Sequence, residues 1–113
     1  MTHPESQVLS VLVFALPPLT VLIAIPMILG WVRPNPWYGV RTRKTRSSPE
    51  IWYRANRVGG IYLTMATLSA LAMWGMMTLY PMPEELRQPI DLVILAACQG
   101  VASLAILLQV RKM

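Results

Sequence analysis

The sequence predicts an all-α membrane protein, with three transmembrane helices and a short amphipathic helix in the first, cytoplasmic loop. The chain has 113 residues, of which 55% are hydrophobic and only 13% are charged. An average soluble domain carries about 25% charged residues, and a soluble domain of this size buries too little surface to hide so many apolar side chains. The chain also holds three apolar runs of about twenty residues, the length that crosses about 30 Å of hydrocarbon.

The first predicted span covers about residues 8–30 and contains no charged residue. No positively charged segment precedes it and no small-residue cleavage site follows it, so we expect a retained helix rather than a signal peptide. Pro17, Pro18 and Pro26 lie inside this span. Neighbouring helices in a membrane bundle can satisfy the carbonyl groups that proline leaves without a donor, and we expect a kink near Pro17 and Pro18.

The stretch 31–60 separates the first two apolar runs and holds seven of the ten Lys and Arg and three of the four Trp. Trp31 and Trp37 are typical of the aromatic belt at a membrane interface. Gly39 follows a tyrosine in a probable turn, where glycine accepts a positive φ. A dense basic run follows at residues 41–46. The spacing of the polar residues predicts one compact structure here rather than a loose polybasic loop.

A helix start is predicted near Pro49. Ser47 and Glu50 have capping-box spacing, while Ser48 before Pro49 fits an N-cap followed by proline at the first helical position. The helix that starts here is amphipathic, and we expect it to lie at the headgroup level. Gly59 and Gly60 then permit either a bend or a close helix contact before the next span.

The second predicted span covers about residues 58–80, residues 81–89 form a turn, and the third span covers about residues 90–110. Together with the first span they make one membrane domain, residues 1–113. Gln99 lies near the middle of the third span, and we expect it to find a hydrogen-bond partner on another helix. Small residues at helical spacing favour close packing of the second span: Ala66, Ala70, Ala72 and Gly75.

The distribution of charge predicts the orientation. The first loop and the C-terminal Arg111 and Lys112 are basic, whereas the second loop is not. By the positive-inside rule the first loop and the C-terminus are cytoplasmic and the N-terminus is outside.

The composition excludes several other classes. Cys98 is the only cysteine and His3 the only histidine, so we expect no disulfide, no metal site and no cofactor. The spans offer Asp91 alone as a carboxylate, and no nucleophile–base pair or glycine-rich phosphate loop is present, so we expect a protein that is not an enzyme and has no catalytic residues. A basic loop beside three apolar runs indicates a membrane face rather than nucleic acid.

An ordered set of residues in the first loop resembles the signature of the SdpI-like family of small bacterial integral membrane proteins. The residues that carry the resemblance are Asn35, Tyr38-Gly39-Val40-Arg41-Thr42, Thr45, Ser48, Trp52, Asn56-Arg57 and Gly59 or Gly60. The resemblance implies a multi-pass protein of the bacterial cytoplasmic (inner) membrane. It also implies a link to immunity against antimicrobial peptide toxins, or in some members to signal transduction.

Hydrogen-bond donors and positive charges gather in this signature, and the helix that starts near Pro49 adds free backbone N–H groups. Such a set suits an anion, and the planar guanidinium of arginine binds oxyanions through two hydrogen bonds. We therefore predict a site for a lipid or peptide headgroup, in which Arg41, Asn56 and Arg57 lie close together. The predicted site residues are Asn35, Arg41, Thr42, Thr45, Trp52, Asn56 and Arg57.

Three functions remain open. The first is a non-enzymatic immunity or binding module that contacts a toxin peptide or an anionic lipid headgroup. The second is an oligomeric small transporter or flippase, and the third is a membrane anchor for a cytoplasmic signalling partner. We also predict a homodimer, which is compatible with each of these functions. The simplest alternative is that the basic loop only fixes orientation and attracts anionic lipid, at about 1 kcal/mol per basic residue.

Overall fold

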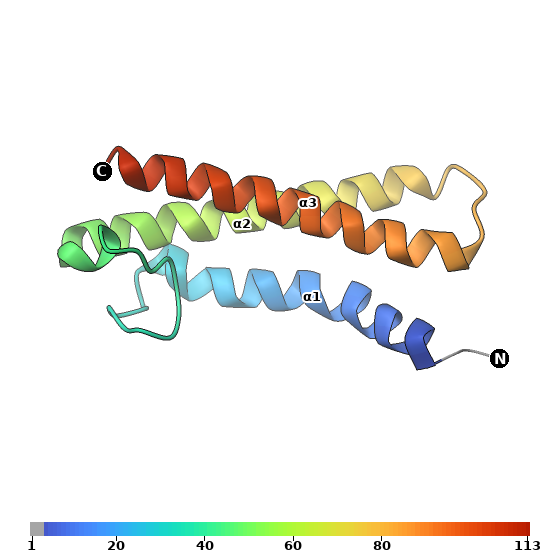
Figure 1. Cartoon of the computed structure of the whole chain (residues 1–113), viewed down its shortest axis with the longest axis horizontal. Coiled ribbons are helices and arrows are strands. Elements are labelled where there is room, and N and C mark those ends of the chain that lie inside the picture. Colours follow the sequence, from blue (N-terminus) through green and yellow to red (C-terminus); the bar gives the residue numbers. More distant parts are fainter. Residues whose placement is uncertain (1–3) are drawn as a thin grey trace.

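The computed structural model describes residues 4–113, with the backbone alone at Ser6. The element order is α1 (Pro4–Leu29), the short 3-10 helix η1 (Thr45–Ser47), α2 (Pro49–Met77) and α3 (Glu84–Arg111). The long helices run antiparallel to their chain neighbours in an elongated bundle of 52 × 25 × 21 Å (Figure 1). All three are long and apolar enough to cross a membrane. The expected all-helical, multi-pass architecture is therefore confirmed for the described residues.

Helix α1 runs without interruption through Pro17, Pro18 and Pro26. It ends where Gly30 takes a positive φ of 75°. The amide of Trp31 there donates to the carbonyl oxygen of Pro26 at 2.9 Å. A left-handed glycine at this position is a common helix ending, because a residue without Cβ adopts it at little cost.

Helix α2 begins at Pro49, and the Ser48 hydroxyl accepts a hydrogen bond from the amide of Ile51 at 3.2 Å. Of the two predicted helix starts, the Ser48 N-cap is therefore the one that forms. The helix then continues through Gly59 and Gly60 to Met77. The separate amphipathic helix that we expected from the sequence is thus the first part of α2, and of the two possibilities at the glycine pair the bend does not form.

Close packing against α1 explains why α2 stays straight at its two glycines. A Cβ atom on Gly60 would lie 2.9 Å from the carbonyl oxygen of Ala24, so the glycine allows two backbones to touch. Helices in a membrane associate through such contacts, because hydrophobicity does not drive them together there. The close helix contact, which was the other possibility at this pair, is the one observed.

Helix α3 begins at Glu84, six residues before the predicted span, and the turn between α2 and α3 covers residues 78–83. The carbonyl oxygen of Pro83 accepts hydrogen bonds from the amides of Leu86 and Arg87, both at 3.1 Å. Acidic side chains in the first turn favour a helix N-terminus. Pro89 is tolerated inside the first turns, where it removes only one donor from the helix.

Helix α2 contacts both other helices, and α2 and α3 cross each other in the view of Figure 1. The buried face of α2 carries small side chains. Of the four small residues predicted to pack closely, Ala66 and Ala70 are buried there, whereas Ala72 and Gly75 are exposed. Gln99 of α3 donates to the Thr67 hydroxyl of α2 at 2.7 Å, which confirms the predicted interhelical partner. Most large apolar side chains point outward, where a membrane would cover them.

Candidate functional site

The loop of residues 30–48 folds back over one end of the bundle, beside the C-terminus (Figure 1). Trp52, in the first turns of α2, is its central packing residue and is fully buried. The indole contacts Met27 and Val32, with Tyr38 and Val40 packed around them. The indole N–H donates to the carbonyl oxygen of Val32 at 2.9 Å. Trp52 thus joins the end of α1, the loop and α2.

Asn56 lies one turn beyond Trp52 and is 1% exposed. Its Oδ1 accepts a hydrogen bond from the amide of Val40 at 2.8 Å, and its Nδ2 donates to the carbonyl oxygen of Trp52 at 2.9 Å. Gly39 has a φ of 107° and packs directly against the side-chain amide of Asn56, so that a Cβ atom on residue 39 would collide with Asn56 Oδ1. The predicted glycine turn is confirmed, and it is fastened to α2 through Asn56.

Asn35 shapes the first half of the loop. Its Oδ1 accepts hydrogen bonds from the amides of Trp37 and Tyr38 at 2.8 and 2.7 Å, and its Nδ2 donates to the carbonyl oxygen of Arg33 at 2.7 Å. An asparagine that bonds to backbone groups two and three residues away is a recurrent turn motif. The Tyr38 hydroxyl then donates to the carbonyl oxygen of Ile23 in α1.

Thr42 and Thr45 close the second half of the loop through reciprocal hydrogen bonds. Thr45 is fully buried. Its hydroxyl accepts from the amide of Thr42 at 2.7 Å and donates to the Thr42 carbonyl oxygen at 3.0 Å, while the Thr42 hydroxyl accepts from the amide of Thr45 at 3.1 Å. These two side chains use their hydrogen-bonding capacity largely on each other's backbone.

The two signature arginines, Arg41 and Arg57, are exposed and bind different segments. Arg41 donates to the carbonyl oxygen of Pro36 in the loop, whereas Arg57 donates through Nε to the carbonyl oxygen of Ile28 at 3.2 Å. Among the described residues, no hydrogen bond links Arg41, Asn56 and Arg57 to one another. The loop is compact as predicted. The three side chains do not form one cluster of hydrogen bonds, because each bonds to a different backbone segment.

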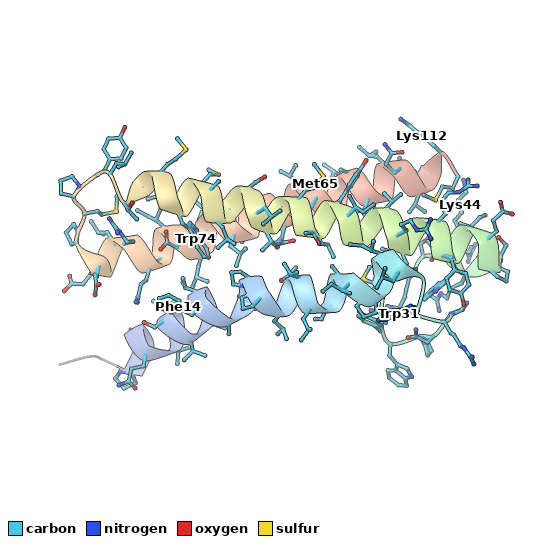
Figure 2. All side chains as sticks on the ribbon, turned by 180° about the vertical axis from the view of Figure 1, so that it is seen from behind. Phe14, Trp31, Lys44, Met65, Trp74 and Lys112 are labelled. Atoms are coloured by element: carbon cyan, nitrogen blue, oxygen red, sulfur yellow. The ribbon has the colours of Figure 1, made fainter. Side chains whose placement is uncertain are left out.

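The remaining positive charge of the loop is largely unpaired. Within the part of the chain that the structure describes, the one ion pair joins Arg54 to Glu50 at 3.4 Å on the exposed side of α2. Lys44 donates to the carbonyl oxygen of Arg111 at 2.9 Å, which ties the loop to the end of α3. Figure 2 shows Lys44 and Lys112 at the same end of the molecule. Four exposed guanidinium groups there have no described partner: Arg33, Arg43, Arg46 and Arg111.

A groove of about 470 Å³ lies between this loop and the last turns of α3. Cationic side chains border it, and leucine side chains form its apolar wall; these residues are Arg43, Lys44, Arg111, Leu104, Leu107 and Leu108. The leucines are 59%, 48% and 49% exposed. Sequence reasoning missed this groove, although the spacing i, i+3, i+4 places the three leucines on one helix face, one turn before Arg111.

The described residues contain no group of three or more His, Cys, Asp or Glu side chains that could hold a metal ion. The donor set of the site is amide, hydroxyl and guanidinium, which suits an anion rather than a metal cation.

Comparison with protein families finds a match to the SdpI/YfhL protein family over residues 32–109. The matched region contains most of the loop, all of α2 and nearly all of α3, which is more than half of the chain. No curated protein and no solved structure matches the chain.

Proposed function

Because this chain belongs to the SdpI/YfhL protein family, we propose that it is a non-enzymatic binding module of the bacterial cytoplasmic membrane. Its ligand is an anionic phospholipid, bound in the groove between the basic loop and α3. The bound lipid keeps the membrane intact when a toxin peptide attacks it, which is an immunity function. The proposal includes the orientation that the charge distribution predicts, in which the loop and the C-terminus face the cytoplasm and the N-terminus faces outward.

The observation that carries the proposal is that the unpartnered guanidinium groups of Arg43 and Arg111 border the same groove as an exposed apolar wall. Lys44 adds a third positive charge to the lining, which contains no acidic side chain. A phosphate between the guanidinium groups of Arg43 and Arg111 would accept charge-assisted hydrogen bonds from them. An acyl chain would lie along the leucine face, which is already directed toward lipid.

The signature residues contribute by shaping the loop. Trp52, Asn56 and Thr45 are buried and hydrogen-bonded within the protein. An ordered loop holds its arginines in place before a ligand arrives, so less conformational entropy is lost on binding. Arg41 and Arg57 are exposed outside the groove lining, and their charge adds to the attraction of anions to this end of the molecule.

Lipid binding is tested by measuring phosphatidylglycerol affinity with native mass spectrometry of the purified protein. The double variant Arg43→Gln/Arg111→Gln removes two cations that border the groove, and its affinity should fall about tenfold, equivalent to about 1.4 kcal/mol. The control Arg33→Gln/Arg46→Gln removes the same charge from exposed positions outside the groove lining. Equal losses in both variants would show that the loop attracts lipid without a defined site.

The immunity function is tested in the source bacterium. Deletion of the gene should increase killing by membrane-active peptides, and the wild-type gene should restore resistance. The groove double variant should restore less resistance than the control double variant. Unchanged sensitivity across a panel of such peptides would remove the support for immunity while leaving the lipid site intact.

A membrane anchor for a cytoplasmic protein is the second candidate. It is favoured by the exposed, unpartnered Arg33 and Arg46 and by Trp37, which is 84% exposed. Affinity capture with the Arg33→Gln/Arg46→Gln variant should then lose a partner that the wild type retains. Identical partners for the two proteins would exclude this function for these residues.

A further inference from the structure

A second cavity, of about 590 Å³, lies between the three helices toward the end of the bundle away from the basic loop. Phe14, Pro17 and Pro18 of α1 form one wall, and Leu71 and Trp74 of α2 form another. Figure 2 shows Phe14 and Trp74 on facing helices, far from Trp31 and Lys44. Phe14 is 78% exposed, so the cavity opens to the membrane. Its volume is within the range of small-molecule sites.

Asp91 of α3 lines this otherwise apolar cavity and is 9% exposed. It lies seven residues after Glu84, about 10 Å along the helix axis. Helix α3 has 28 residues, so it is about 42 Å long and extends about 6 Å beyond each side of a 30 Å hydrocarbon layer. With the helix centred on the layer, Asp91 lies roughly 4 Å inside its edge, in a region where ionisable residues are rare and mark functional sites.

The Asp91 carboxylate interacts with the positive charge of Arg87, but it forms no direct ion pair with any described residue. Arg87, one turn earlier, donates instead to the carbonyl oxygens of Met77 and Tyr80, at 3.5 and 3.2 Å, and forms no ion pair with Asp91. The Trp74 indole donates at 3.0 Å to the backbone carbonyl of Asp91 rather than to its carboxylate. A carboxylate largely removed from water is stabilised as an ion by a cation in direct contact, and a cation in the cavity would supply that contact.

The opposite wall also favours positive charge. Pro17 and Pro18 lack amide hydrogens, so the carbonyl oxygens of Val13 and Phe14 do not receive their usual helix hydrogen bonds. Both of these residues line the cavity. The aromatic rings of Phe14 and Trp74 add surfaces that attract organic cations.

We propose that this cavity binds a lipophilic organic cation that enters from the membrane, with Asp91 as its counter-ion. The site is separate from the basic loop, because the two bind ligands of opposite charge and share no lining residue. Either proposal can therefore fail without the other.

The probe for the test is tetraphenylphosphonium, measured by equilibrium dialysis against the full-length protein in detergent. The wild type should bind it saturably, with one ion per chain. Asp91→Asn should weaken binding at least tenfold, since it keeps the shape of the side chain and removes the charge. The matched control Glu85→Gln removes the same charge from an exposed position on α3 and should bind as the wild type does.

Two further measurements keep the proposal falsifiable if Asp91→Asn does not fold. Leu71→Trp fills the cavity and retains the carboxylate, and it should also weaken binding at least tenfold. Tetraphenylborate has the same shape and the opposite charge, and the wild type should not bind it saturably. Equal affinity for the two ions, unchanged binding in Leu71→Trp, or no saturable binding of the cation would each overturn the proposal.

Discussion

At the scale of single residues, the loop owes its shape to side chains that bond to backbone groups. Asn56 satisfies the amide of Val40 from inside α2, and Trp52 reaches the carbonyl of Val32. Both side chains are buried, so their removal would leave backbone groups without a donor or acceptor, at about 1–3 kcal/mol each. Gly39 completes the arrangement, because only a residue without Cβ fits above the Asn56 amide.

Gly39→Ala should lower the free energy of unfolding by roughly 2–4 kcal/mol. The new Cβ atom collides with Asn56 Oδ1, and the φ of 107° is unfavourable for alanine. Unfolding can be followed by circular dichroism in mixed detergent micelles of increasing denaturing strength.

The matched control is Gly75→Ala, in the helical part of α2. A Cβ atom there meets no other atom within 4 Å, and alanine favours helix over glycine by up to about 1 kcal/mol. This variant should be as stable as the wild type or more stable. Equal destabilisation of both variants would contradict the close contact between Gly39 and Asn56.

At the scale of elements, α2 organises the molecule. Its first turns support the loop, its glycine pair contacts α1, and its middle section bonds to α3 through Thr67 and Gln99. A bend at Gly59 and Gly60 would separate the loop from the bundle. Because α2 is one continuous helix, it holds the basic loop in a fixed position relative to the membrane spans.

A distance measurement can check that α2 is one helix. Spin labels at the exposed positions Arg54 and Met73 should report Cα atoms about 28 Å apart, since a helix rises about 1.5 Å per residue. Pulsed electron resonance of the reconstituted protein gives this distance. A distance several ångströms shorter would indicate the bend that the glycine pair first suggested, and a pair of labels at Met65 and Met73, beyond the glycines, serves as the reference.

At the scale of the whole molecule, charge is segregated along the long axis. The basic loop and the C-terminal end of α3 lie together at one end, while Glu84, Glu85 and the N-terminal end of α1 lie at the other (Figure 1). The two proposed sites follow this separation. The anion groove lies at the basic end, and the cation cavity lies toward the other end.

The proposed orientation can be checked by labelling single cysteines in intact cells after Cys98→Ser. A cysteine at Leu79, in the turn between α2 and α3, should react with a membrane-impermeant maleimide added from outside. A cysteine at Arg46 should react only after the membrane is opened, because basic loops remain in the cytoplasm. The reverse pattern would contradict the orientation.

Outward-facing small residues bear on the oligomeric state at the same scale. Ala96 and Gly100 of α3 are exposed in the single chain, and Gly100 faces open space; such small residues permit close approach of a second helix. We propose a homodimer on this basis. The mass of the protein in nanodiscs would distinguish a dimer from a monomer, and a monomer at all concentrations tested would exclude it.

The sequence by itself determined the membrane class, the number of spans, a helix start near Pro49, the turn at Gly39 and the family, because apolar run length, capping residues and glycine conformations are local properties. Only the tertiary structure decided the rest. Gly60 forms a close contact with Ala24 instead of a bend, and α3 begins at Glu84, before the predicted span. The side chain of Asn56 is buried and bonds to the loop, whereas Arg43 and Arg111 border one groove. The physical reason is that a polar side chain in a loop serves the protein or a ligand depending on which backbone groups lie near it, and those neighbours come from distant parts of the chain.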